Sequence, residues 1–496
     1  MKYVVALDQG TTSSRAVVFD QAGNSIASHA IEFEQIYPKP GWVEHRPEDI
    51  LNSQIQALRL AVEKARIQPR DIEAIGITNQ RETTLLWERA TGKPLSNAIV
   101  WQCRRTAPLV ERLKRDGLGN FLRDRTGLIP DAYFSGTKLQ WLLDTIPDAR
   151  DRARRGQLCF GTVDSFLAWH LCGGRIHVTD ATNAARTMLF NIHQQRWDPE
   201  LLLAMDIPEQ VLPSVKDSSE VIGMLDKSIL GREIPVASLA GDQHAALFGQ
   251  GCFAPGMSKS TYGTGCFLLM NTGFHPVKSM NNLITTVAWR LDGQPRYALE
   301  GSVFVAGAVV QWLRDEMHLI ATSAESDQVA REIPDNANVY FVPAFTGLGA
   351  PHWDMYSRGT IVGLTRGTGR AHIVRAALES IVYQCADVLL AMSRDSSMKS
   401  DTLLVDGGAS ANEFLMQFQA DILGMRVLRP RVIETTAFGA AMLAGRAVGL
   451  WSDDELRGLV QREREFAPNM GEAERERLLR QWHRAVERSS GWAEED

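Results

Sequence analysis

Asp8-Gln9-Gly10-Thr11-Thr12-Ser13-Ser14 is a turn of small, hydrogen-bonding residues near the start of this 496-residue chain. A short apolar run, residues 3–7, precedes the turn, and a second run, residues 15–20, follows it. Small residues between two apolar runs predict a β-hairpin. The backbone N–H and hydroxyl groups of this turn suit phosphate oxygens, and Gly10 allows the backbone to approach a ligand closely.

Asp8 lies at the end of the first predicted strand, next to this phosphate-type turn. A carboxylate repels phosphate, so its natural partner is Mg²⁺ carried by a nucleotide. The pattern G-x-x-x-x-G-K-[ST] is absent from the chain, which excludes an ordinary P-loop. The sequence therefore indicates phosphoryl transfer on a different scaffold.

Two further glycine-containing turns occur in the second half of the chain. Residues 260–265 precede the apolar run 266–270, and residues 406–412 join an apolar run to an amphipathic stretch. The last arrangement places helix N–H groups against a nucleotide. Any one such turn is as readily an ordinary connection between elements. Three of them together favour phosphate binding.

Length and composition limit the class of protein. A single core stops growing at about 250–300 residues, so two domains with a cleft between them are expected. The net charge of −6 argues against a nucleic-acid partner, and the longest apolar stretch, residues 303–310, argues against membrane insertion. Six scattered cysteines and no apolar signal sequence before Asp8 predict a reduced, cytoplasmic protein.

Asp242 follows the apolar residues 236–240, which places it at the mouth of a predicted strand. Phosphoryl transfer to an alcohol needs a group that orients the hydroxyl and accepts its proton, and a carboxylate can do both. Asp242 could instead cap a helix that begins at Gln243. The residues alone leave both roles open.

Several longer stretches carry a family resemblance. Residues 133–142, 359–379, 33–45 and 343–351 are similar to the signature and flanking segments of the FGGY carbohydrate kinases, in a match over roughly residues 1–450. The resemblance implies an α/β protein with the two-domain actin/Hsp70-like (ribonuclease H-like) ATPase fold and a central cleft. It implies an N-terminal FGGY kinase domain over residues 1–250, with the polyol and phosphate side, and a C-terminal one over residues 251–496, with the nucleotide side.

The resemblance is to members that phosphorylate glycerol with ATP and Mg²⁺, and it implies the product sn-glycerol 3-phosphate, with Asp242 as general base. The polyol-binding residues that it implies are Arg81, Glu82, Trp101, Tyr133, Asp242 and Gln243. The nucleotide-binding residues that it implies are Thr11, Thr12, Ser13, Arg15, Thr264, Gly307, Gln311, Gly408 and Asn412. Asp8 and Asp242 are the implied Mg²⁺ neighbours, and a homodimer or homotetramer is the implied assembly.

Without the resemblance, an Arg-Glu pair is usually a surface ion pair, and a Trp usually packs in a core. Two other functions stay open: a kinase of the same family for another sugar, and an actin-like ATPase that drives a conformational cycle. The chain also departs from the family pattern. His244 replaces a Gln and is expected to be a packing or cap variant. The segment 226–233 is shorter than the glycine-rich loop that binds fructose 1,6-bisphosphate in some relatives. Only Gly231 and Arg232 remain there that could contact an anion, so the resemblance does not imply this regulation.

Overall fold

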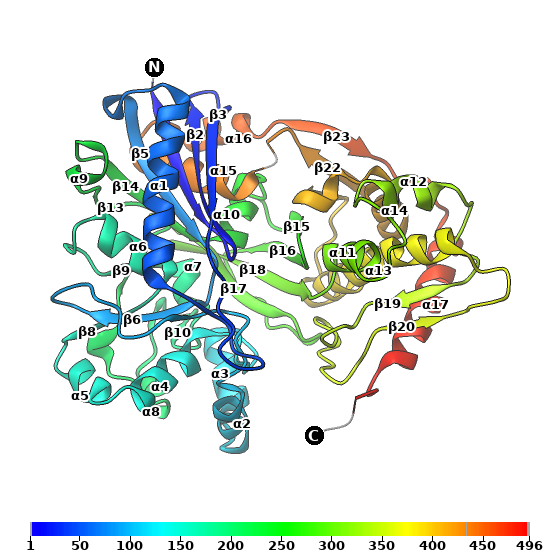
Figure 1. Cartoon of the computed structure of the whole chain (residues 1–496), viewed down its shortest axis with the longest axis horizontal. Coiled ribbons are helices and arrows are strands. Elements are labelled where there is room, and N and C mark those ends of the chain that lie inside the picture. Colours follow the sequence, from blue (N-terminus) through cyan, green and yellow to red (C-terminus); the bar gives the residue numbers. More distant parts are fainter. Residues whose placement is uncertain (1, 433, 494–496) are drawn as a thin grey trace.

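The computed structural model describes residues 2–432 and 434–493, which form two large β-sheets with helices packed around them. In Figure 1 most of the first half of the chain, in blue to green, lies on the left, and most of the yellow to red part lies on the right, whereas the orange helices at residues 435–459 lie beside the first sheet. The predicted two-domain α/β fold is thus confirmed.

The first sheet has the strand order β13-β14-β5-β1-β2-β3. Its strands are β1 (Tyr3–Gln9), β2 (Ser13–Asp20), β3 (Ser25–Glu32), β5 (Ile72–Asn79), β13 (Ser219–Met224) and β14 (Pro235–Gly241). β1, β2 and β3 are antiparallel neighbours, which confirms the predicted hairpin, whereas β5 and β14 run parallel to β1.

The second sheet has the order β17-β18-β16-β15-β21-β22-β23. Its strands are β15 (Ser258–Tyr262), β16 (Cys266–Gly273), β17 (Ile284–Leu291), β18 (Gln294–Val303), β21 (Thr402–Asp406), β22 (Arg426–Pro430) and β23 (Arg462–Phe466). Strands β18, β16 and β15 are antiparallel, β21 and β22 run parallel to β15, and β23 closes the edge antiparallel. The second sheet therefore repeats the strand pattern of the first, with β17 added.

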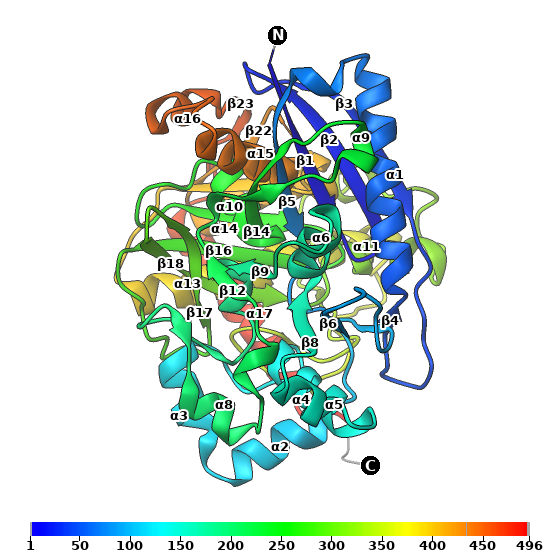
Figure 2. The same ribbon diagram turned by 90° about the vertical axis from the view of Figure 1, so that its left-hand side faces the viewer.

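A smaller unit extends from the first sheet. Its four-stranded sheet is formed by β4 (Glu44–His45), β7 (Ala98–Ile99), β6 (Thr84–Glu88) and β8 (Leu158–Thr162). Its helices are α2 (Ala107–Arg115), α3 (Leu118–Thr126), α4 (Ser135–Thr145), α5 (Ala149–Arg154) and α8 (Pro199–Ala204). Figure 2 shows these helices gathered at the end of the molecule opposite the N-terminus.

Short strand pairs complete the β-structure: β9 (Val178–Asp180) with β12 (Ser214–Lys216), β10 (Phe190–Asn191) with β11 (Arg196–Trp197), and β19 (Tyr340–Val342) with β20 (Thr360–Val362). The remaining helices are α1 (Pro47–Ala65), α6 (Val163–Leu171), α7 (Ala181–Ala184), α9 (Lys227–Leu230), α10 (Asp242–Gly249), α11 (Gly307–Asp315), α12 (Glu325–Arg331), α13 (Arg370–Ser396), α14 (Glu413–Leu423), α15 (Thr435–Ala447), α16 (Asp453–Leu459) and α17 (Glu472–Ser489). Among the described residues, no helix combines the length and apolar character needed to cross a bilayer.

Helix α1 shows how the sequence builds the layers. It begins with Pro47, whose fixed φ suits the first helical turn, followed by Glu48 and Asp49, which complement the helix dipole. Apolar residues at helical spacing, Ala57 and Leu58 among them, are fully buried in one core with β1 and β2. Figure 2 shows α1 lying along these strands.

Helices α10 and α15 join the two halves of the chain. An added Cβ on Gly439 of α15 would lie 1.8 Å from the Ala245 carbonyl oxygen of α10, and one on Gly249 would lie 2.2 Å from the Thr435 carbonyl oxygen. Only glycine permits such close contact between helix backbones. α15 also rests on the first sheet, where the Ser238 hydroxyl donates a hydrogen bond of 2.8 Å to the Ala440 carbonyl oxygen.

Candidate active site

Strand register brings the predicted catalytic and polyol residues to one edge of the first sheet. Gln9 of β1 pairs with Asn79 of β5, and Asn79 pairs with Gly241 of β14. The three strands are parallel, so the residues at their carboxyl ends share this edge. Asp8, Arg81 and Asp242 therefore lie together although they are far apart in the sequence.

Asp242 is the first residue of α10, and Gly241, not Asp242, occupies the N-cap position. The carboxylate of Asp242 accepts a hydrogen bond of 2.7 Å from the backbone N–H of Gln243, and its Oδ1 lies 3.1 Å from Nε of Arg81. Its side chain remains 30% exposed, so a substrate can still reach it. Helix capping alone does not explain why the Asp242 carboxylate lies beside Arg81 and stays partly exposed.

Arg81 belongs to a buried cluster of four charged side chains. Two of them, Arg186 and Glu300, were not predicted from the sequence. Glu300 accepts hydrogen bonds of 2.6 and 3.0 Å from the two terminal nitrogens of Arg81. Arg186 donates from Nε to Glu82, at 2.6 Å, and from its terminal nitrogens to Glu300, at 3.1 and 3.2 Å. All four side chains are at most 2% exposed.

Electrostatics favour the charged forms of Glu300, Arg81 and Arg186, whereas burial raises the pKa of Glu82 against the opposing effect of Arg186 and Arg81. Burial alone would raise the pKa of Glu300, but Arg186 and Arg81 outweigh it and hold that pKa well below its usual range. Burial opposes ionisation of Arg81 as well, and Glu300 restores it, so its pKa stands well above the usual value. Each of the four side chains has a hydrogen-bond partner within the cluster, which a buried charged group requires. The alternative interpretation, that Arg81 and Glu82 form an ordinary ion pair at the surface, is therefore wrong.

Glu82 reaches this cluster through an unusual backbone conformation. Its φ is 61°, in the left-handed region, which costs an L-residue about 1–2 kcal/mol. The position lies in the short connection between β5 and β6, where the chain turns sharply. Such outliers concentrate at functional sites.

Three aromatic rings lie beside the charged cluster. The Trp101 ring is 5.6 Å from that of Tyr133 and 6.4 Å from that of Phe267, both edge-on. The Trp101 indole N–H donates a hydrogen bond of 3.0 Å to the Thr11 hydroxyl, so this half-buried residue links the aromatic wall to the phosphate-type turn. Burial, reinforced by Glu82, raises the pKa of Tyr133, which stays a neutral phenol.

Gln243 and His244 follow Asp242 on α10 and are both buried. Lys259 of β15, also buried, donates from Nζ to Oε1 of Gln243. Burial and the neighbouring Arg81 hold the pKa of His244 well below its usual value, so its imidazole is neutral. It lies 3.4 Å from the Thr286 hydroxyl, and we keep the packing interpretation for it.

Asp8 lies among other charged groups at the end of β1. Burial raises its pKa to about 6; Arg15 opposes this shift, and the carboxylates of Asp242 and Glu434 add to it. A terminal nitrogen of Arg15 lies 3.5 Å from a carboxylate oxygen of Glu434, another residue that was not predicted from the sequence. Beside them, the backbone N–H of Gly10 bonds to the Ser13 carbonyl oxygen at 2.9 Å, which closes the turn that carries Thr11, Thr12 and Ser13.

The second sheet brings the other two turns together. Thr261 of β15 pairs with Asp406 of the parallel strand β21, so the turns that follow these strands share an edge. Thr264 accepts a hydrogen bond of 2.8 Å from the backbone of Ala306, and an added Cβ on Gly307 would lie 2.5 Å from the Gly263 carbonyl oxygen. Thr264 and the start of α11 are thus in direct contact, as expected for one binding surface.

The remaining predicted nucleotide residues have different surroundings. Gln311 is exposed on α11, and Gly408 is exposed in the turn after β21. The side chain of Asn412 caps α14 by accepting a hydrogen bond of 2.8 Å from the Leu415 N–H, and its amide group donates to Ser326 at 3.2 Å. Asn412 therefore has a structural role besides any contact with a ligand.

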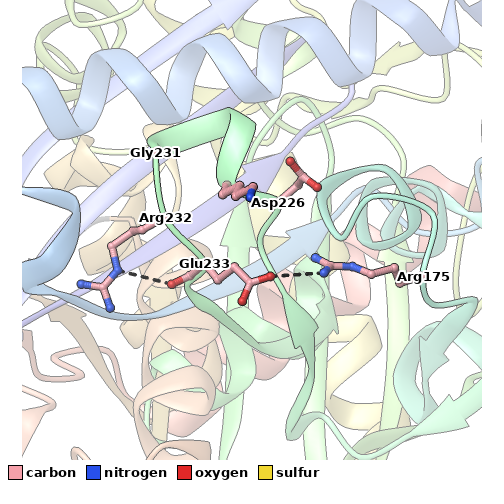
Figure 3. A pocket seen from close by; sticks show the side chains of 6 residues that line it. Arg175, Asp226, Gly231, Arg232 and Glu233 are labelled. Carbon is pink, nitrogen blue, oxygen red and sulfur yellow. Dashed lines mark hydrogen bonds and ion pairs between the residues drawn. The ribbon is translucent and has the colours of Figure 1, made fainter.

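Gly231 and Arg232, the expected anion contacts, line a surface hollow of about 550 Å³ near α9 (Figure 3). Glu233 and Asp226 also line it, and Glu233 lies 3.2 Å from Arg175. Arg175 and Lys227 line the hollow as well, so three cationic side chains face two carboxylates there. The carboxylates offset part of the positive charge that an anionic ligand would need.

The class of protein follows from this fold and from comparison with known families. Residues 3–249 match the N-terminal domain of the FGGY family of carbohydrate kinases, and residues 259–448 match its C-terminal domain. The chain therefore belongs to the FGGY family of carbohydrate kinases, as the sequence predicted.

Individual relatives narrow the similarity further. The chain is 60% identical to the glycerol kinase of Caldanaerobacter subterraneus over 100% of both chains, and 60% identical to glycerol kinase 2 of Thermotoga maritima over 99% of both. Its structure is similar to that of Plasmodium falciparum glycerol kinase with ADP, with a TM-score of 0.93, 35% identity and coverage of 99% of this chain and 98% of that one. The fold is also shared with a xylulose kinase from Lactobacillus acidophilus, with a TM-score of 0.88.

Proposed function

We propose that this protein phosphorylates glycerol with ATP and releases sn-glycerol 3-phosphate and ADP. The observation that carries the proposal is the position of Asp242, which is partly exposed and held by Arg81 beside Glu82, Gln243 and the aromatic residues. A small polyol needs charged and amide groups for its hydroxyls and an apolar wall for its carbons. This site offers both, and full-length relatives at 60% identity are glycerol kinases.

In the proposed reaction a glycerol hydroxyl oxygen forms a bond to the γ-phosphorus of ATP while the bond from that phosphorus to the β–γ bridging oxygen breaks. The hydroxyl proton passes to the Asp242 carboxylate, and ADP leaves with the bridging oxygen. The transition state of such transfers is loose, so the base mainly orients the alcohol and takes its proton late. A carboxylate is sufficient for that role.

Substrate binding is divided among the residues around Asp242. Arg81 and Glu82 would bind the other hydroxyls, with Gln243 and Tyr133 as additional partners. Because Glu300 and Arg186 already fix Arg81 and Glu82, these groups meet the substrate pre-oriented, which lowers the entropy cost of reaching the reactive geometry. Trp101 and Phe267 would cover the carbon side.

ATP would lie between the turns of the two sheets. Thr11, Thr12, Ser13 and Arg15 would contact the phosphates from the first sheet, and Thr264 would contact them from the second. Gly307, Gln311, Gly408 and Asn412 would line the remainder of the nucleotide site.

The residues present fit a Mg²⁺ ion. Burial raises the pKa of Asp8, Arg15 opposes this shift, and the nearby carboxylates of Asp242 and Glu434 add to it, so three carboxyl groups lie near one another there. No group of three His, Cys, Asp or Glu side chains in residues 2–432 and 434–493 could hold a metal by itself, and Mg²⁺ in kinases is held largely by phosphates and water. Asp8 and Asp242 would hold the ion, which would neutralise phosphate charge.

A polyol panel tests the proposed function. ATP-dependent ADP release is measured with glycerol, erythritol, xylulose and ribulose, and the highest kcat/KM is expected for glycerol. A higher kcat/KM for xylulose would replace this proposal with another sugar kinase activity. ADP release that does not depend on any polyol, together with filament formation, would indicate an actin-like ATPase instead.

The cellular setting is part of the proposal. We place the protein in the cytoplasm, where ATP is available, and expect a homodimer or homotetramer with a domain boundary at residue 250. Sedimentation of the purified protein checks the oligomeric state, and limited proteolysis checks the boundary.

A further inference from the structure

Lys259 is a fully buried lysine at the junction of three segments of the site. Its Nζ donates to Oε1 of Gln243, to the Thr261 hydroxyl at 2.8 Å, and to the Phe267 carbonyl oxygen at 3.4 Å. Gln243 belongs to α10, whereas Thr261 and Phe267 belong to β15 and β16 of the second sheet. One ammonium group therefore joins the proposed polyol site to the second sheet.

The chemistry of lysine determines how Gln243 is oriented. An ammonium group has three donors and no acceptor, so only the amide oxygen of Gln243 can face it. The amide nitrogen, with its two donors, is then directed away from Lys259. Without Lys259, the amide could rotate and present either its oxygen or its nitrogen.

We propose that Lys259 is a positioning residue for polyol recognition, which fixes the Gln243 carboxamide so that its NH₂ group donates to a hydroxyl oxygen of the substrate. This inference rests on the proposed function, because it takes Gln243 as a polyol contact. Lys259 itself does not touch the substrate in this arrangement.

Lys138, which is also fully buried, shows that such a role is not general for buried lysines. Lys138 donates to the backbone carbonyl oxygens of Tyr133, of Phe134 at 3.4 Å and of Glu82 at 3.5 Å. It holds main-chain segments and orients no side chain. Lys259 differs because its contacts include the amide of Gln243.

A Gln243 side-chain amide that is held in one orientation would let the site discriminate between glycerol and analogues that lack a hydroxyl. A buried donor that finds no acceptor costs free energy, so an analogue that lacks the contacted hydroxyl is rejected. If the amide can rotate, that penalty falls. Loss of Lys259 should therefore weaken discrimination between glycerol and its deoxy analogues, in addition to lowering activity.

The test is a double-mutant cycle with Lys259→Met and Gln243→Leu, in which kcat/KM is measured for glycerol, propane-1,2-diol and propane-1,3-diol. Lys259→Met should lower kcat/KM for glycerol about 10–100-fold, mainly through KM, and reduce the ratio of glycerol to one diol about 10-fold. In the Gln243→Leu background the same substitution should cost less than about 3-fold. Lys216→Met, which removes a lysine at the surface, is the control and should change nothing.

Equal losses in both backgrounds, or an unchanged glycerol-to-diol ratio for both diols, would overturn the proposal. If Lys259→Met does not fold, Lys259→Gln takes its place, because a neutral amide can still donate to Gln243 while the buried volume is kept. That variant should retain more discrimination than Gln243→Leu, and equal discrimination would count against the role of Lys259. Should the polyol panel identify another substrate, the cycle is run with it and its deoxy analogues, so failure of the proposed function is separate from failure of this inference.

Discussion

The two sheets of this protein have the same strand pattern but differ in what they place at their carboxyl edges. The first sheet presents charged side chains, including Asp8, Arg81 and Asp242, whereas the second presents glycine-containing turns around Thr264 and Gly408. A repeated scaffold thus carries two kinds of site, proposed here as chemistry on the first edge and nucleotide binding on the second. The separation is incomplete in both directions. Glu300, Lys259 and Phe267 reach the first site from the second sheet, and the turn at residues 10–13 of the first sheet is proposed to contact the phosphates of the nucleotide.

The largest expected effect comes from Asp242 on the first edge. Asp242→Asn should lower kcat about 1,000-fold, since an amide cannot accept the hydroxyl proton. Affinity for ADP, measured by calorimetry without Mg²⁺, should change less than about 2-fold, because Asp242 is proposed to contact the metal ion and the polyol but not the nucleotide itself. Retained turnover would contradict the base assignment.

The variant Glu300→Gln tests whether the proposed polyol site on the first sheet depends on this residue of the second sheet. Glu300→Gln leaves Arg81 and Arg186 without their shared anion, so it should raise KM for glycerol about 10–100-fold and reduce the free energy of unfolding by about 3 kcal/mol. Steady-state kinetics and urea unfolding measure the two effects. Glu220→Gln, in an exposed pair with Lys216, is the control and should cost less than about 0.5 kcal/mol.

Gly307 tests the second edge separately. Gly307→Ala places a methyl group 2.5 Å from the Gly263 carbonyl oxygen, which forces the adjacent turn to move. KM for ATP should rise about 5–10-fold while KM for glycerol stays within about 2-fold, because the two sites lie on different turns. Gly458→Ala meets no atom within 4 Å and serves as the control. A parallel rise in both KM values would mean that the edges are not separate.

The smallest effects concern the pH dependence of stability at two buried aspartates, whose replacement by asparagine should change the free energy of unfolding in opposite directions. In the first half, burial raises the pKa of Asp164 to about 7, so the folded state binds the proton more tightly than the unfolded state, and stability falls as pH rises from about 4 to 7. Asp164→Asn removes that penalty and should raise the free energy of unfolding at pH 8 by about 2 kcal/mol. Unfolding curves at pH 5 and pH 8 measure the difference.

In the second half, burial opposes ionisation of Asp387, but His352, His483 and Trp482 hold its pKa below the usual value. Asp387 in turn raises the pKa of His483 above 6.5. The His483 contribution is therefore fully present below pH 6.5 and is lost as pH rises through its folded pKa. Asp387→Asn should destabilise more at pH 6 than at pH 8, and an equal loss at both would exclude this coupling.

Much of the architecture could be predicted from the sequence because its signals are local. The first hairpin, the three glycine-containing turns and the place of Asp242 after a strand each depend on a few adjacent residues. Arg81, Trp101 and Tyr133 were found only through the resemblance, because nothing in their immediate sequence distinguishes them from surface or core residues.

Glu300, Arg186, Lys259 and Phe267 could not be predicted, for a physical reason. Arg81 and Glu300 are 219 positions apart, and their pairing depends on the register of two sheets. Glu300, which follows the apolar residues Ala298 and Leu299 in β18, was the available signal, since such a charge must find partners when it is buried. Lys259 lies among Ser and Thr residues in β15 and carried no such signal.

The position of α15 has a consequence for how the protein is made. The face of the first sheet that contains Val4, Ala6 and Ala74 is buried against Ala437 and Ala440 of α15. A ribosome delivers those strands hundreds of residues before it delivers α15, so this apolar face stays uncovered during most of translation. A chain that stopped short of α15 would expose it permanently, and we expect such a fragment to require chaperones or to aggregate.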